Sequence, residues 1–166
     1  MKNILFVENN HLIKFSDIFN QYKDNSIQST YFFESLYWII EENEPIKLVI
    51  FGDNLDVDID VLLDDILEFD HIAYTSEERE RFIELYNIYK PSAFKEIIAT
   101  YSKKLNKEVP KFAIYTTGDF YEYYGEGKLD EYLISQDCPI FYKSNGAIDY
   151  MSYIKKLEEY IEEIIK

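Results

Sequence analysis

The sequence is poor in the residues that cross-link chains, bind transition metals or break regular structure. Its 166 residues include one cysteine, two histidines, five glycines and four prolines. The lone Cys138 excludes an intramolecular disulfide, and a solitary thiol suits a reducing compartment. His11 and His71 have no cysteine or second histidine at metal-ligand spacing. We therefore expect no disulfide framework and no zinc site.

Positive charge and long apolar runs are also scarce. There are 17 basic and 32 acidic residues, which give a net charge of −15. Such a charge repels nucleic-acid phosphates and anionic lipid, and favours protein partners, basic ones among them. No run approaches the roughly 20 apolar residues of a membrane span, and the first apolar run is too short for a signal peptide. We expect a cytoplasmic protein that contacts neither nucleic acid nor membrane.

Short apolar runs alternate with segments of helical periodicity. Strands are predicted at 3–7, 26–32, 47–51, 71–75, 112–115 and 139–142. Helices are predicted at 11–22, 34–42, 61–69, 77–89, 92–105, 128–135 and 147–165. This alternation predicts an α/β fold, with a mostly parallel sheet of five or six strands and helices on both faces. No linker interrupts the pattern, so residues 1–166 are expected to form one domain.

Several polar residues and a glycine directly follow these strands. Glu8, Asn9 and Asn10 follow the first strand, and Gly52 and Asp53 follow the third. In doubly wound sheets, ligands bind outside the carboxyl ends of the strands. These residues are therefore the first candidates for a site.

Two segments resemble the receiver domain of response regulators. The run Ile4-Leu5-Phe6-Val7-Glu8-Asn9-Asn10 resembles the opening strand that ends in paired acids. The run Leu48-Val49-Ile50-Phe51-Gly52-Asp53-Asn54-Leu55 resembles the strand that delivers the phosphoacceptor aspartate. The resemblance is clearest over residues 1–55 and implies a flavodoxin-like three-layer αβα sandwich. In that family the acids hold Mg²⁺, a Ser or Thr ending the fourth strand contacts the phosphoryl group, and a Lys ending the fifth balances its charge.

At the positions that align with the family's acid pair and phosphoacceptor, this sequence has no carboxylates. The acid pair falls on Asn9 and Asn10, whose uncharged amides coordinate Mg²⁺ only weakly, and Glu8 would have to substitute. The phosphoacceptor position falls on Gly52, which cannot be phosphorylated. Asp53 comes one residue late and, because side chains alternate along an extended segment, would point elsewhere. The resemblance thus implies a degenerate pocket with no cofactor beyond weak Mg²⁺ binding.

The switch threonine and the lysine each have two candidates. Thr75 with Lys90 matches the local sequence pattern of the family. The segment between these two residues is rather short to contain a helix and a strand. Thr116 or Thr117 with Lys143 leaves room for both and makes the region near 72–110 a helical insertion. We favour the second assignment.

The remaining motifs point to no further chemistry. The acidic stretch 53–70 contains Asp56-x-Asp58-x-Asp60, but Val61 and Leu67 stand where a calcium loop needs glycine and glutamate. That stretch is interpreted as a solvated loop and helix face. The glycines at 118, 125 and 127 do not form a phosphate-binding loop.

The leading hypothesis is a pseudo-receiver, a non-catalytic signalling module of two-component type. It would act through protein–protein association without aspartyl phosphorylation. One alternative is a metal- or nucleotide-dependent enzyme that uses Glu8, Asp53, Thr117 and Asp119 in the crevice at the strand ends. Another is an acidic inhibitor or immunity-type protein that covers a basic partner.

Overall fold

The computed structural model describes residues 2–7, 18, 21–29, 32–42, 44–52, 58–67, 73–116, 137–142 and 150–166. Its strands are β1 (Ile4–Val7), β2 (Ser26–Ser29), β3 (Leu48–Phe51), β4 (Lys111–Thr116) and β5 (Ile140–Tyr142). Its helices are α2 (Phe32–Ile40), α3 (Ile59–Ile66), α4 (Ser76–Ile88), α5 (Lys90–Lys104) and α8 (Tyr150–Ile165). Of the helix predicted at 11–22 only residues 18, 21 and 22 are described, and the helix predicted at 128–135 lies outside the described residues.

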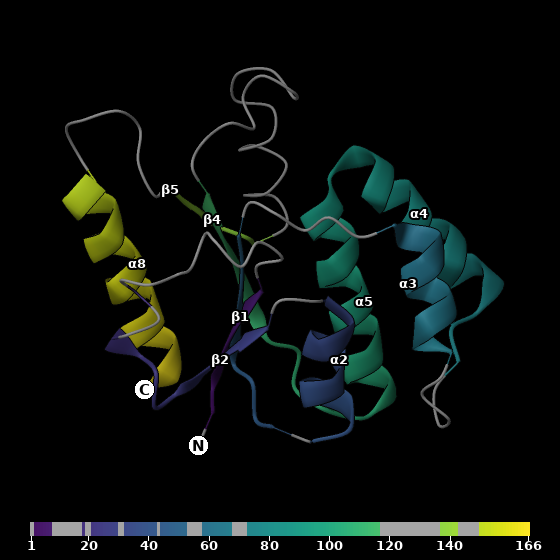
Figure 1. Cartoon of the computed structure of the whole chain (residues 1–166), viewed down its shortest axis with the longest axis horizontal. Coiled ribbons are helices and arrows are strands. Elements are labelled where there is room, and N and C mark those ends of the chain that lie inside the picture. Colours follow the sequence, from purple (N-terminus) through teal and green to yellow (C-terminus); the bar gives the residue numbers. More distant parts are fainter. Residues whose placement is uncertain are drawn as a thin grey trace.

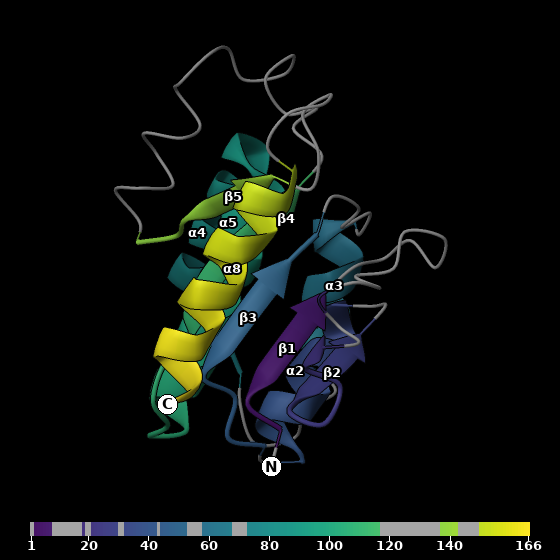
Figure 2. The same cartoon turned by 90° about the vertical axis from the view of Figure 1, so that its left-hand side faces the viewer.

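The five strands form one parallel sheet in the order β2-β1-β3-β4-β5. This is the order of flavodoxin-like doubly wound sheets. Ile4 lies opposite both Ser26 and Leu48, and Leu48 lies opposite Lys111, so β1, β2, β3 and β4 begin in step. β5 begins three residues further along β4, where Ile140 lies opposite Ile114. Figure 2 shows β2, β1 and β3 side by side. The predicted α/β fold with a parallel sheet is confirmed for the part of the chain that the structure describes.

The two central strands are buried on both faces. Every residue of β1 and β3 is at most 1 % exposed, as their unbroken apolar sequences predict. Alternate side chains enter two separate apolar clusters: Leu5 and Val49 pack with α2 and α5, whereas Ile4 and Leu48 pack with α8. Figure 1 shows α8 on one side of the sheet and α2, α3, α4 and α5 on the other.

The connection from β3 to β4 runs through three helices. α5 packs on the sheet, where Phe94 lies 6.4 Å from Phe51 between ring centroids. α4 packs against α5 and α3, and Phe82 is its one fully buried side chain. The helices predicted at 77–89 and 92–105 are confirmed, and they separate at Tyr89, just before Lys90-Pro91.

The strand predicted at 71–75 is wrong where the structure describes it. Ala73 to Thr75 form no strand, and Thr75 is the N-cap of α4. The Thr75 hydroxyl accepts a hydrogen bond from the Glu78 N–H at 3.1 Å, and the Glu78 carboxylate accepts one from the Thr75 N–H at 2.9 Å. This reciprocal pair is a capping box, and its Thr-x-x-Glu signature stands in the sequence.

Other element boundaries differ by a few residues from the expected ones. β2 ends at Ser29 and α2 begins at Phe32, within the range predicted as strand. α3 begins at Ile59, because the Asp58 carboxylate accepts a hydrogen bond from the Asp60 N–H at 2.9 Å and caps the helix. Among the described helices, none is long and apolar enough to cross a membrane.

Replacing the α4 cap should weaken the fold measurably. We expect Thr75→Ala to lower the free energy of unfolding by about 1 kcal/mol, because the first turn of α4 loses a hydrogen-bond acceptor for its backbone. Urea unfolding followed by circular dichroism measures the change. Ser76→Ala, at the exposed next position, is the matched control and should change stability far less. Equal effects of the two substitutions would contradict the capping role.

Candidate functional site

Most of the predicted site residues lie outside the described part of the chain. Glu8, Asn9, Asn10, Asp53, Thr117 and Lys143 belong to this group. Gly52 is described and buried, and its N–H donates a hydrogen bond of 2.8 Å to the Val7 carbonyl oxygen. The carboxyl ends of β1 and β3 are therefore joined, with Gly52 beside the end of β1.

The two assignments for threonine and lysine differ in their relation to the sheet. Thr116 is the last residue of β4, and β5 ends at Tyr142, directly before Lys143. Because β3, β4 and β5 are parallel neighbours, Thr116 and Tyr142 end their strands at the same edge of the sheet as Gly52, and Lys143 itself lies outside the described residues. Thr75 instead caps α4, and Lys90 opens α5 with its ammonium 5.6 Å from the centroid of the Tyr86 ring. Neither Thr75 nor Lys90 therefore ends a strand, as the assignment to this pair requires.

The described part of this edge offers no phosphoacceptor carboxylate and no set of metal ligands. Gly52 has no side chain that could accept a phosphoryl group. Within the described ranges, no three His, Cys, Asp or Glu side chains gather as a metal-ligand set. Two of the acidic side chains at the start of α3 have partners: Asp58 caps the helix, and Asp60 forms a 3.2 Å ion pair with Arg79.

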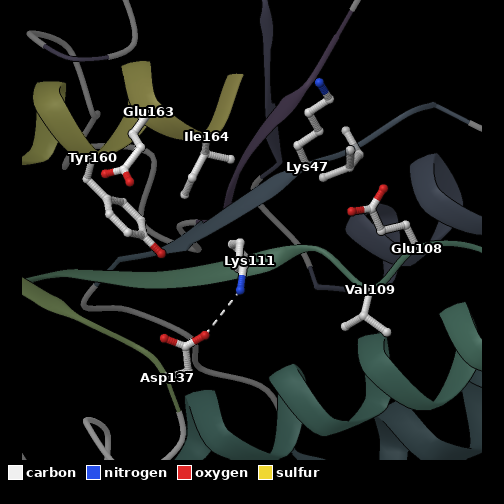
Figure 3. Close-up of a pocket in the computed structure, with 9 residues that line it drawn as sticks. Lys47, Glu108, Val109, Lys111, Asp137, Tyr160, Glu163 and Ile164 are labelled. Atoms are coloured by element: carbon white, nitrogen blue, oxygen red, sulfur yellow. Dashed lines mark hydrogen bonds and ion pairs between the residues drawn. The ribbon is translucent and has the colours of Figure 1, made fainter. Parts of the chain in front are cut away.

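A pocket of about 450 Å³ lies at the opposite edge of the sheet, where β3, β4 and β5 begin (Figure 3). It is framed by the loops before β3 and β4, the turn before β5 and the C-terminal half of α8. Figure 3 shows charged side chains from all four segments around it. All of its lining residues belong to the described part of the chain.

Lys111 stands at the centre of this pocket. Its N–H donates to the Lys47 carbonyl oxygen at 2.8 Å, which joins the starts of β3 and β4. Its ammonium forms a 3.2 Å ion pair with Asp137, a residue with a positive φ of 54° in the turn before β5. The turn thereby holds a carboxylate beside the first residue of β4.

Tyr160 of α8 closes one side of the pocket. Its ring lies 5.5 Å from the Phe141 ring, and its hydroxyl donates a long hydrogen bond of 3.5 Å to the Phe112 carbonyl oxygen. Burial, with a smaller contribution from Asp137, raises the pKa of Tyr160 to about 12. The hydroxyl therefore stays neutral and remains a hydrogen-bond donor at neutral pH.

A second hollow of about 330 Å³ adjoins the first between the C-terminal ends of α2 and α5. The Lys107 ammonium donates a hydrogen bond to the Ile39 carbonyl oxygen there, and burial lowers the pKa of Lys107. Asn106, with φ 57°, completes the end of α5, since the Lys107 N–H donates to the Ser102 carbonyl oxygen at 2.8 Å. The Ser102 hydroxyl is buried and has no hydrogen-bond partner among the described residues.

Sequence reasoning missed this edge because it looked for ligands at the carboxyl ends of the strands. The pocket also draws its lining from segments that are distant in sequence. Lys47 and Lys111, each standing where a strand begins, were the available signal.

Comparison with known proteins found no matching family model, no similar curated protein and no similar solved structure.

Cys138 is not a nucleophile in this fold. It lies in the core cluster between the sheet and α5, at 2 % exposure. Burial raises the pKa of its thiol to about 12, although the nearby Lys95 favours the thiolate. The thiol is therefore protonated and shielded, as a structural cysteine is.

The shift of Cys138 should make stability depend on alkaline pH. Because the folded pKa is raised above the unfolded value of about 9, the neutral thiol contributes fully below pH 9 and loses its contribution as pH rises from about 9 to about 12. Urea unfolding across this range should show a steeper loss for the native chain than for Cys138→Ala. The native thiol should also resist a thiol reagent at neutral pH until the chain is unfolded. Rapid labelling of the folded chain would show that the thiol is accessible.

Proposed function

We propose that the chain is a pseudo-receiver, a signalling or regulatory module that acts by association with a partner protein and carries no aspartyl phosphate. The proposal includes the three-layer αβα architecture, a helical insertion between β3 and β4, and a cytoplasmic location. The alternative of an enzyme at the same strand-end crevice gains no support from the described residues.

One observation carries the proposal: Gly52 occupies the end of β3, hydrogen-bonded to the end of β1, in a sheet of order β2-β1-β3-β4-β5. The strand order and the joined strand ends agree with the receiver resemblance. At the position where that resemblance expects a phosphoacceptor, a glycine leaves no carboxylate to receive the phosphoryl group.

The residue types that follow β1 also support a module without aspartyl phosphate. A phosphoryl group needs a metal ion and an ammonium around it, and Mg²⁺ needs carboxylate oxygens. The sequence supplies Asn9 and Asn10 where two carboxylates are expected. With a glycine at the acceptor position and uncharged amides at both positions of the acid pair, we infer that this edge of the sheet acts through association with a partner.

A second candidate, an acidic module that covers a basic partner, is favoured by the exposed arc of α3. Asp64 and Leu67 follow one another along this arc, and Val61 beside them is 56 % exposed, whereas Asp60 at the start of the arc is paired with Arg79. Carboxylates next to exposed apolar side chains suit a basic partner surface, whose binding would weaken with added salt.

The lead proposal is tested with Mg²⁺ and acetyl phosphate, and in parallel with beryllofluoride. We expect the native chain to show neither stoichiometric phosphorylation by intact mass nor a beryllofluoride-dependent change in its amide spectrum. Stoichiometric labelling, at Asp53 for example, would overturn the proposal.

A gain-of-function variant gives the test a positive arm. We expect the triple substitution Asn9→Asp, Asn10→Asp and Gly52→Asp to acquire a Mg²⁺-dependent response to beryllofluoride. It places carboxylates at the three positions where the receiver resemblance expects them. The matched control carries Asn9→Asp and Asn10→Asp with Gly52→Asn, which has the same side-chain size but no acceptor. If the folded triple variant responds no more than this control, residues 9, 10 and 52 do not lie together as they would in a receiver domain.

A further inference from the structure

The pocket at the amino ends of β3, β4 and β5 combines charges of both signs with an apolar floor. The charged side chains on its rim are Lys47, Glu108, Lys111, Asp137 and Glu163. The floor is made by Ile46, Val109 and Ile164, of which Ile46 is buried and the other two are half-buried. Figure 3 shows these charged side chains around the pocket, with the Lys111 ammonium turned toward Asp137.

The rim charges are only loosely compensated by one another. Within the described residues, the Lys47 ammonium and the Glu163 carboxylate form no ion pair. The Lys111–Asp137 pair joins side chains that are 59 % and 83 % exposed, so solvent screens it and an incoming charged group can replace either partner at small cost. The pocket thus offers both a cationic and an anionic partner to a ligand.

Neither sign of charge dominates the pocket. A simple anion would meet three carboxylates and the C-terminal end of α8, whose carbonyl groups carry partial negative charge. A simple cation would meet two ammonium groups. A ligand that carries one charge of each sign, with an apolar group between them and the floor, avoids both conflicts.

We propose that this pocket binds a free α-amino acid with an apolar side chain. The ligand's ammonium group pairs with Glu163, its carboxylate pairs with Lys111, and its side chain covers Ile46, Val109 and Ile164. The volume of about 450 Å³ lies within the range of small-molecule sites. Because the charged partners are exposed, binding is weak, with a dissociation constant of about 1 mM.

This binding site is separate from the proposed pseudo-receiver site at the carboxyl ends of the strands. The pocket lies where the strands begin and Gly52 lies where β3 ends, so the two proposals use different residues. A failure of amino-acid binding leaves the phosphorylation result standing, and phosphorylation of the native chain would leave the pocket's chemistry unchanged.

The ligand class is tested with three probes that share one apolar group. L-leucine carries both charges, 3-methylbutylamine carries only the cation, and 4-methylpentanoate carries only the anion. Each is titrated into isotope-labelled protein to about ten times the expected dissociation constant, and amide shifts are followed. We expect saturable shifts at Lys111 and Glu163 with leucine, and at least about tenfold weaker binding of each single-charge analogue.

Variants assign the charges to residues. Glu163→Gln removes the anionic partner at an exposed position and should weaken leucine binding at least about threefold. Glu159→Gln, one turn earlier on α8 and outside the pocket, is the matched control and should leave binding unchanged. Lys111→Gln should weaken binding like Glu163→Gln, with the exposed Lys103→Gln of α5 as its control. Circular dichroism checks that each variant is folded.

Three results would overturn the proposal. The first is the absence of saturable shifts with leucine. The second is binding of the amine or the acid as tight as that of leucine, which would mean a site for a single charge. The third is an equal loss of binding in Glu159→Gln and Glu163→Gln.

Discussion

The parallel pairing of β1 with β3 is the constraint on which the rest of the structure depends. Both strands are four residues long, buried on both faces and made only of apolar side chains. Parallel neighbours need crossover connections, and helices provide them on the faces of the sheet. All strands must therefore end at one edge and begin at the other. Gly52 lies at the first edge, and Lys47 and Lys111 lie at the second.

The parts of the fold that the sequence predicts well are those in which a single signal decides the structure. The runs 4–7 and 48–51 have no polar interruption, and the last helix has a long apolar stripe, so β1, β3 and α8 appear where they were expected. Residues 71–75 carried two signals. Their short β-rich run suggested a strand, but Thr75 and Glu78 together cap a helix, and these two hydrogen bonds outweigh the weak strand preference of so short a run.

Of the two candidate sites, one could be predicted from the sequence and the other could not. The end of β3 at Gly52 could be predicted, because a glycine directly after an apolar run marks a strand end. The pocket at the other edge could not, because it depends on register: Lys111 meets Lys47 only through the alignment of β3 with β4, and Asp137 meets Lys111 only through its turn. Such long-range juxtapositions leave no periodic trace in the sequence.

The distribution of the scarce basic residues follows from the same topology. Helices that connect parallel strands run opposite to them, so α2, α5 and α8 end at the edge where the strands begin, and their last carbonyl groups make this edge partly negative. Lysines compensate there: Lys107 donates to the Ile39 carbonyl of α2, and Lys103 and Lys104 occupy the last turn of α5. The mixed charges of the pocket thus arise from helix ends meeting strand starts.

Exposed charges at the two edges of the sheet are largely screened from each other. A strand of four residues spans roughly 13 Å, which exceeds the Debye length of about 8 Å at physiological ionic strength. A charge change at one edge therefore has little direct effect on a pKa at the other. Coupling would require movement of β1 or β3, and their fully buried side chains pack against helices on both faces. The uncharged Gly52 after β3 consequently places no electrostatic demand on the pocket where the strand begins.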